Sequence, residues 1–258
     1  MDCVDFGKTG LRVSRLAFGT GTRGWAGHSD QTDLGVDGLA SLLRLAHDHG
    51  VNFWDAADEY GSHPHVARAL QGIPRHEVVI ATKTTSRSAE QATRDVERFL
   101  RELGTDVLDI VLLHFMTQAD WPQRYMGAME ALSRAQEQGK VRAVGVSCHG
   151  LGALLAAAET AWAEVVLARI NMAGVNMDAS PSKMVPVIER LYTSGKAVYG
   201  MKVLGCGQLA GKARAAIKYV FQLGVVHALT IGISRREQLL ENVGLVEKLA
   251  PQYPLQLL

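Results

Sequence analysis

Short apolar runs alternate with amphipathic stretches along almost the whole chain. The apolar runs have the length of strands and cover Arg15–Gly19, Val51–Asp55, Val78–Lys83, Leu108–His114, Val141–Ser147, Val165–Asn171, Ala197–Leu204 and Ala228–Ile233. Apolar positions recur at helical spacing over Leu39–His47, His65–Leu70, Ala89–Leu103, Tyr125–Gln138, Leu151–Thr160, Lys183–Ser194, Lys212–Leu223 and Glu237–Leu249. Short apolar runs favour strands, and the wider spacing favours amphipathic helices. The chain is therefore predicted to repeat a strand-then-helix unit eight times.

The order of these elements predicts the fold class. Strands that alternate with helices form right-handed units whose strands are parallel. Eight such units in 258 residues match the usual size of a closed (β/α)8 TIM barrel, and an open doubly wound sheet is the competing architecture. No linker or low-complexity segment divides the chain, so residues 1–258 are predicted to form one domain. Ahead of the first strand, Val4–Gly7 and Leu11–Ser14 flank a turn that contains glycine and predict a small β-hairpin.

Composition narrows the possible partners and the compartment. The formal net charge is +1, which does not favour a nucleic-acid or anionic-membrane partner. The three cysteines are far apart and offer no disulfide framework, which suits a reducing compartment. No apolar run approaches the roughly 20 residues of a membrane span, and the first residues lack the pattern of a signal peptide. We therefore expect a soluble cytoplasmic protein.

Ionisable side chains close three neighbouring predicted strands. Asp55 ends the second strand, Lys83 the third and His114 the fourth, and Tyr60 follows Asp55 by five residues. Each has an ordinary interpretation when taken alone: a turn former, a solvated strand end, a core histidine and a surface aromatic. Active sites of these barrels lie at the carboxyl ends of the strands and draw on several of them. We therefore expect the four side chains to converge on one mouth of the barrel.

These residue types together suit the reduction of a carbonyl group. A phenol with an ordinary pKa near 10 is a weak acid at neutral pH, and a neighbouring cation favours its ionised form. Lys83 would supply that cation, and Asp55 would hold the ammonium group in place. His114 would orient the carbonyl group, while the hydride must come from a cofactor because no side chain donates one. The set predicts an enzyme in which Tyr60 is the general acid.

At these residues the sequence resembles the aldo-keto reductase superfamily. The stretch Phe53–Gly61 is similar to its Asp-x-Ala-x-x-Tyr-Gly motif, and Ala81–Lys83 and Leu112–His114 are similar to the strand ends that carry its lysine and histidine. The hairpin Phe6–Ser14 resembles the family's barrel plug, and Ile231–Asn242 resembles its last cofactor segment. The resemblance implies NADPH-dependent reduction of a small aldehyde or ketone, with Tyr60 as the proton donor.

The resemblance also implies where a nicotinamide cofactor would bind. The cofactor positions are Thr20, Gly21, Ser147, Arg169, Met201, Lys202, Gly232, Ser234, Arg235, Gln238, Glu241 and Asn242. Three positions depart from the family pattern: Cys148 replaces the usual Asn, Arg169 a Gln, and Met201 an aromatic residue. Arg235 or Arg236 would bind the 2′-phosphate of NADP(H), while NAD(H) stays possible if both are merely exposed helix residues. The departures leave open a regulatory, NADP-binding barrel with little turnover.

The substrate pocket is expected to have aromatic and apolar walls. Trp25, Phe115 and Met116 are the predicted wall residues, and Trp121 is a further candidate that would otherwise cap the next helix. No metal site and no oligomeric state are predicted.

Two sequence motifs and one nucleophile point to other enzymes. Gly19–Gly24 fits the Gly-x-Gly-x-x-Gly dinucleotide fingerprint, but the residues after it lack the helical period that the fingerprint requires. Tyr192 and Lys196 have the spacing of a short-chain dehydrogenase, but Gly195 ends the helix between them. Lys83 as a Schiff-base nucleophile would indicate an aldolase, a hypothesis that gives Tyr60 no role.

Overall fold

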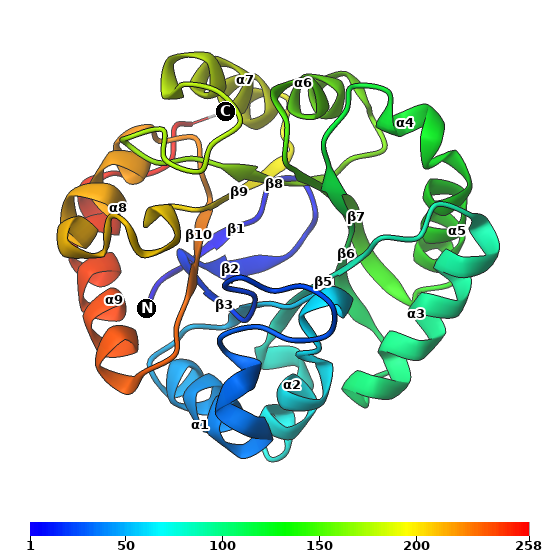
Figure 1. Ribbon diagram of the computed structural model, residues 1–258, viewed down its shortest axis with the longest axis horizontal. Helices are drawn as coiled ribbons and strands as arrows, with labels where there is room; N and C mark the ends of the chain where they lie inside the picture. The colour runs from blue at the N-terminus through cyan, green and yellow to red at the C-terminus, as the bar shows by residue number, and fades with distance from the viewer. Residues whose placement is uncertain (258) are drawn as a thin grey trace.

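Eight parallel strands close into a barrel in the computed structural model, which describes residues 1–257 (Figure 1). Each strand pairs with the next along the chain, and the last pairs with the first. In that order the strands are β3 (Leu16–Gly19), β4 (Phe53–Asp55), β5 (Val79–Thr84), β6 (Leu108–Met116), β7 (Val141–Cys148), β8 (Val165–Arg169), β9 (Ala197–Met201) and β10 (Ala228–Gly232). The closed sheet confirms the predicted (β/α)8 barrel and excludes the open doubly wound sheet.

The helices form a ring outside the barrel (Figure 1). They are α1 (Gly35–Asp48), α2 (His63–Leu70), α3 (Ala89–Leu103), α4 (Trp121–Arg124), α5 (Met126–Glu137), α6 (Leu151–Glu159), α7 (Pro181–Thr193), α8 (Ala213–Gln222) and α9 (Arg236–Leu249). Short 3-10 turns are η1 (Thr32–Leu34), η2 (Asp58–Tyr60), η3 (Arg75–Glu77), η4 (Gly205–Gly207), η5 (Ala210–Lys212) and η6 (Ala250–Gln252). None of the helices within residues 1–257 combines the length and apolar character needed to cross a membrane.

The predicted bounds hold best where the sequence carries explicit end signals. The helix α3 has its predicted bounds because the Ser88 hydroxyl accepts a hydrogen bond from the Gln91 amide, and Gly104 adopts the left-handed conformation. The predicted seventh strand is too long, because Lys202 has a φ of 61° and turns the chain out of β9. The short helix α4 is absent from the predicted elements.

An N-terminal hairpin fills one end of the barrel. Strands β1 (Cys3–Asp5) and β2 (Arg12–Ser14) are antiparallel, as predicted. The Phe6 ring packs at 5.4 Å from the Phe53 ring and 5.9 Å from the Tyr199 ring, measured between centroids. Aromatic pairs at these distances add packing energy to the burial of their surface. The hairpin therefore closes the barrel interior and supports the side chains above it.

Alternation along each strand separates an inner core from an outer one. Side chains that face inward form one apolar cluster with the hairpin, and those that face outward pack against the helices. Inner residues recur at every second position, as with Phe53 on β4, Ala81 on β5 and Leu112 on β6. The same period makes Asp55, two residues after Phe53, point to the inside.

His227 links the hairpin to the barrel wall. The Gly7 amide donates a hydrogen bond to His227 Nε2 at 3.2 Å, while Nδ1 lies 3.2 Å from the Val198 carbonyl oxygen. A neutral ring with its proton on Nδ1 satisfies these two contacts, and Nδ1 also lies 3.1 Å from the Val198 amide nitrogen. Burial lowers the pKa of His227 to about 4. Since the unfolded histidine titrates near 6.5, this contact stabilises the fold fully above about pH 6.5 and less at lower pH.

We expect the stability of the protein to fall as the pH drops from 6.5 to 4, partly through His227. A shift of this size corresponds to about 3 kcal/mol at the acidic end of the window. His227→Gln should reduce the slope of the unfolding free energy against pH, measured by urea titration at several pH values. The exposed His76 gives the matched control, His76→Gln, which should keep the wild-type slope. Equal slopes in both variants would contradict this role for His227.

Candidate active site

The predicted catalytic residues lie together at the carboxyl ends of adjacent strands. Asp55, Lys83 and His114 come from β4, β5 and β6, and each follows an inner-core residue by two positions. The register pairs Asp55 with Ala81 and Lys83 with Leu112, so Lys83 lies one inward position further along the barrel. Strand alternation thus directs all three side chains into the same mouth. Tyr60 reaches this mouth from η2, just after β4.

A buried ion pair forms the base of the site. Lys83 is fully buried, and its ammonium group donates to Asp55 Oδ1 at 2.8 Å and to the Ala56 carbonyl oxygen at 2.7 Å. Asp55 also accepts from the Tyr199 hydroxyl at 2.9 Å. Burial by itself would lower the pKa of Lys83, but Asp55 and Tyr60 raise it above its ordinary value. Lys83 is therefore a fixed cation rather than a solvated strand end.

Tyr60 and His114 face each other above this pair. The Tyr60 hydroxyl lies 3.4 Å from His114 Nε2, and the Lys83 ammonium lies 4.8 Å from the centre of the Tyr60 ring. Burial raises the pKa of Tyr60, and the charge of Lys83 opposes this rise only in part. Burial, together with Lys83, lowers the pKa of His114 to about 3. At neutral pH the site therefore holds a protonated phenol beside a neutral imidazole.

Flanking residues fix the short segment that carries Tyr60. Asp58 accepts two hydrogen bonds of 2.7 Å from Arg98 on α3, in the bidentate geometry that makes such pairs strong. The Gly27 amide donates to the Glu59 carbonyl oxygen at 3.0 Å. Gly61 has a φ of 62°, and a Cβ there would overlap the Gly27 carbonyl oxygen. These contacts place the phenol without any direct bond to its ring.

The glycines of the Gly-x-Gly-x-x-Gly stretch make room for the Tyr60 ring. A Cβ at Gly21 or at Gly24 would overlap ring carbons of Tyr60. No helix follows this stretch directly, since it leads into a loop that ends at η1. The stretch is therefore packing for the tyrosine, and it lacks the helix that a dinucleotide fingerprint needs.

The Tyr-x-x-x-Lys stretch lies away from the mouth. The Tyr192 hydroxyl donates to the Gln256 carbonyl oxygen at 2.6 Å. Lys196 precedes β9 and donates to the Thr160 and Ala163 carbonyl oxygens. Both residues belong to the end of the barrel opposite the carboxyl ends of the strands. This placement, within a closed barrel, rules out the short-chain dehydrogenase hypothesis.

A cleft of about 450 Å³ is lined by Tyr60 and Asp55 and also by Ser234 and Gln238 at the start of α9. Six predicted cofactor residues line it: Gly21, Met201, Lys202, Gly232, Ser234 and Gln238. Six others do not contribute to its wall: Thr20, Ser147, Arg169, Arg235, Glu241 and Asn242. Thr20 is buried, and its hydroxyl donates to the Asp55 carbonyl oxygen at 2.9 Å. Sequence reasoning missed Thr22 and Gln31, which line the cleft from the loop after β3.

A hydrogen-bonded network ties several of the remaining residues together. Arg169 Nη1 donates to Asp178 at 2.7 Å, and Arg169 Nη2 contacts His149 Nδ1. His149 Nε2 lies 3.0 Å from the Ser147 hydroxyl. Burial and the Arg169 charge keep the pKa of His149 far below its usual value. Asp178 thus balances the extra charge of Arg169. Because Asp178 lies in a loop, no pattern in the sequence indicated this contact.

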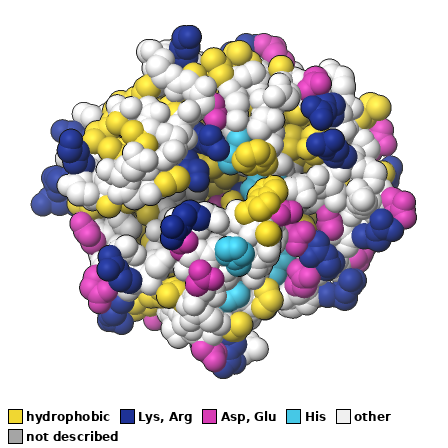
Figure 2. Space-filling model, in the orientation of Figure 1, with side chains coloured by type: hydrophobic (Ala, Val, Ile, Leu, Met, Phe, Trp, Pro, Cys, Tyr) yellow, Lys and Arg dark blue, Asp and Glu magenta, His cyan; other side chains and the backbone are white. Residues whose placement is uncertain are grey.

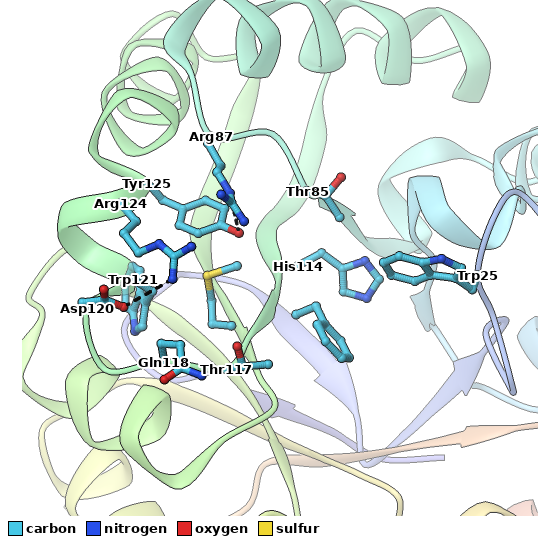
Figure 3. Close-up of a pocket in the computed structure, with 12 residues that line it drawn as sticks. Trp25, Thr85, Arg87, His114, Thr117, Gln118, Asp120, Trp121, Arg124 and Tyr125 are labelled. Atoms are coloured by element: carbon cyan, nitrogen blue, oxygen red, sulfur yellow. Dashed lines mark hydrogen bonds and ion pairs between the residues drawn. The ribbon is translucent and has the colours of Figure 1, made fainter.

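A second cavity, of about 240 Å³, opens beside His114 (Figure 3). The predicted wall residues Trp25, Phe115 and Met116 all line it, and so does Trp121. Trp25 and Phe115 are half exposed, with ring centroids 6.0 Å apart. Figure 2 shows hydrophobic side chains and histidines gathered at the centre of this face of the molecule. The cavity also contains residues that were not predicted, namely Thr85, Arg87, Thr117, Gln118, Asp120, Arg124 and Tyr125.

We expect the protein to lose stability when only one partner of the buried Lys83–Asp55 pair is removed. Lys83→Met would leave Asp55 charged and buried, so it should lower the unfolding free energy by about 3–5 kcal/mol. Adding Asp55→Asn to Lys83→Met should recover part of that loss, because the stranded charge disappears. The exposed pair of Arg94 and Glu90 supplies a control, since Arg94→Met should cost less than about 1 kcal/mol. Chemical denaturation measures all three, and equal losses for the two single variants would refute this energetic role of the pair.

Comparison with known proteins matches residues 15–215 to the aldo/keto reductase family. An aldo-keto reductase of Mycobacterium avium (strain 104) is 34% identical over 115 residues, which are 42% of this chain and 38% of that protein. The NADH-specific methylglyoxal reductase of Escherichia coli (strain K12) is 26% identical over 170 residues, which are 57% of this chain and 52% of the relative. The matched segments thus span about half or less of these two relatives.

Solved structures show the same likeness over a greater length. A structure from Pseudomonas aeruginosa, assigned to the aldo-keto reductases, is 27% identical with a TM-score of 0.81, and the match covers 95% of both chains. The family match covers most of the chain, and the barrel with its hairpin agrees with it. This protein therefore belongs to the aldo/keto reductase family of oxidoreductases.

Proposed function

We propose that the protein reduces an aldehyde or ketone to an alcohol with NADPH, and that Tyr60 is the general acid. One observation carries the proposal. Tyr60 lines the cleft of about 450 Å³, His114 lines the second cavity, and their polar atoms lie 3.4 Å apart. The two cavities therefore meet at a protonated phenol that is backed by a buried cation. A cofactor in the cleft and a carbonyl compound in the cavity would meet at this point.

The side chains divide the proton-transfer work among them. Tyr60 donates its proton to the carbonyl oxygen, and the Lys83 ammonium stabilises the phenolate that remains. Asp55 holds Lys83 in place, with the Tyr199 hydroxyl as a further donor to the carboxylate. His114 is neutral, so its Nε2–H form donates a hydrogen bond to the carbonyl oxygen without competing for the proton. The nicotinamide, when bound, supplies the hydride.

The groups along the cleft suit a nicotinamide dinucleotide. The cleft is lined by the Tyr60 phenol and by residues at the N-terminal end of α9, a helix that has no side-chain cap on its free amide groups. Amides at a helix N-terminus suit phosphate oxygens. Gly232 lines the cleft where a Cβ would overlap the Thr22 hydroxyl, so the glycine keeps this wall open beside the loop after β3. The remaining predicted cofactor positions stay predictions.

NADPH is preferred in this proposal because of two arginines at the start of α9. Arg235 and Arg236 are exposed at the start of α9 and form no ion pair within residues 1–257. A guanidinium group binds a phosphate in bidentate geometry, and only NADPH carries the 2′-phosphate. A relative from Escherichia coli is named as NADH-specific, so family membership alone does not decide the matter.

The wild-type protein should oxidise NADPH in the presence of 4-nitrobenzaldehyde, and NADH more slowly. Tyr60→Phe should bind NADPH with unchanged affinity and lose about 10²- to 10⁴-fold in kcat, because the acid is removed and the ring is kept. Absorbance at the nicotinamide band measures turnover, and fluorescence titration measures binding. Near wild-type turnover in Tyr60→Phe would contradict the assigned role.

Two other functions give different results in the same experiment. A regulatory barrel would bind NADPH and show no turnover with any reactive aldehyde. An aldolase would form a Schiff base at Lys83 that borohydride traps, but the Lys83 ammonium already donates to Asp55 and Ala56 and has a raised pKa, which makes it a poor nucleophile. The proton-transfer proposal is the one that uses all four converging side chains.

Gly24 should affect turnover through the position of Tyr60. In Gly24→Ala the new Cβ would displace the phenol, and a shift of about 1 Å can cost on the order of 10²-fold in rate. Gly24 does not line the cofactor cleft, so NADPH affinity should be retained. Gly244→Ala is the control: it meets open space in α9 and should leave kcat unchanged. Steady-state kinetics measure kcat of the two variants. Equal kcat values would contradict a role of Gly24 in placing Tyr60.

A further inference from the structure

Two arginines lie at the end of the substrate cavity away from the catalytic residues. Arg87 and Arg124 both line the cavity whose other end is formed by His114 and Trp25. In Figure 3 the Arg87 guanidinium meets Tyr125 and the Arg124 guanidinium meets Asp120 on one side, and the His114 ring lies on the other. Neither arginine has a role in the proton transfer proposed above.

The Arg87 guanidinium is held by Tyr125. Arg87 forms no ion pair within residues 1–257, and its side-chain hydrogen bond, from Nε to the Tyr125 hydroxyl, is 3.3 Å long. The guanidinium carbon lies 5.4 Å from the centre of the Tyr125 ring, which orients the group by a cation–π contact. Both Nη groups therefore stay available to a ligand. Tyr125 accepts this bond, so its own O–H is a further donor.

Arg124 is only loosely compensated. Its Nη1 lies 3.7 Å from Asp120 Oδ1, which is longer than a hydrogen bond, and both side chains are largely exposed. Asp120 also lines the cavity, so the charged residues of the wall sum to one net positive charge. The neighbouring Thr117 and Gln118 are neutral side chains with hydrogen-bond donors. The far end of the cavity is thus cationic and rich in donors.

We infer that the substrate is a carbonyl compound with a carboxylate at its far end, held by Arg87, Arg124 and the Tyr125 hydroxyl. The inference rests on the proposed function, because it places the carbonyl group of the same molecule at Tyr60 and His114. Guanidinium forks match the planar carboxylate in geometry. The single net charge of the wall is balanced by a carboxylate monoanion, whereas a phosphate dianion would exceed it. Phe115 and Met116 supply apolar wall to the cavity.

The test compares acids with their neutral methyl esters. The aldehydes are 4-carboxybenzaldehyde and 3-(4-formylphenyl)propanoate, which place the anion at two distances, each beside its ester. In Arg87→Gln and in Arg124→Gln the ratio of kcat/KM for acid over ester should fall roughly 5- to 30-fold, the effect of one to two kcal/mol. Using a ratio cancels differences in carbonyl reactivity. Arg94→Gln, at an exposed ion pair on α3, should keep the wild-type ratio.

A variant that removes a negative charge from the wall should change the acid-over-ester ratio in the opposite direction. Asp120→Asn removes the one acidic group of the wall and should raise the acid-over-ester ratio by about 3- to 5-fold, if the carboxylate binds there. If the ratio stays the same in all three cavity variants while the esters are reduced, the anion site is refuted and the proposed function stands. A preference for 4-formylphenyl phosphate over both acids would refute the carboxylate.

Direct binding separates the inference from the proposed function. If the wild-type protein reduces neither acid nor ester, carbonyl reduction itself is refuted. Calorimetric titration with 4-(hydroxymethyl)benzoate, in the presence of NADP, still measures the anion site without turnover. Binding that weakens roughly 5- to 30-fold in Arg87→Gln supports the site, and equal binding in wild type and variant overturns it.

Discussion

The arrangement at the barrel mouth depends on one buried ion pair. A fully buried ammonium is tolerated only where nearby groups accept its hydrogen bonds and balance its charge. Lys83 finds these in the side chain of Asp55 and the carbonyl oxygen of Ala56. Asp55 is in turn held by Tyr199 from β9, across the barrel interior from β4 and β5. The pair therefore depends on the closed barrel. Tyr199 also packs against Phe6 of the hairpin, so the hairpin supports the site through Tyr199.

Periodicity in the sequence was enough to predict the barrel and the convergence of three side chains that we propose to be catalytic. Eight apolar runs indicated the barrel, and the two-residue period of strands brings Asp55, Lys83 and His114 together, because each follows an inner-core residue by two positions. The direction of the Tyr60 pKa was not predictable, since it depends on how deeply the phenol is buried relative to its distance from Lys83. From the sequence only the cation could be weighed, whereas burial is the larger influence in the structure.

Residues in irregular segments were not predictable for a different reason. Asp178 balances Arg169 from the loop between β8 and α7, and no local pattern announces this contact. His149 could have been predicted as a site residue, because it directly follows Cys148 at the carboxyl end of β7, where such sites lie. The Gly19–Gly24 stretch is the opposite case: the sequence was enough to reject its dinucleotide interpretation, but it did not explain the glycines. Their reason is tertiary, because a Cβ at Gly21 or Gly24 would overlap the Tyr60 ring.

Cations line both cavities that meet at Tyr60, and each cavity holds one without an acidic partner within residues 1–257. In the cleft beside Tyr60, Arg23 is paired with Asp30 at 2.9 Å and the nearby Arg169 with Asp178 at 2.7 Å, while Lys202 forms no ion pair within that range. In the cavity beside His114, Arg87 lacks an acidic partner within residues 1–257. An exposed ion pair contributes little to stability, so leaving the Arg87 cation unpaired costs the folded state little. The Tyr125 ring holds the Arg87 guanidinium in the wall of the cavity, where an anion could bind to it.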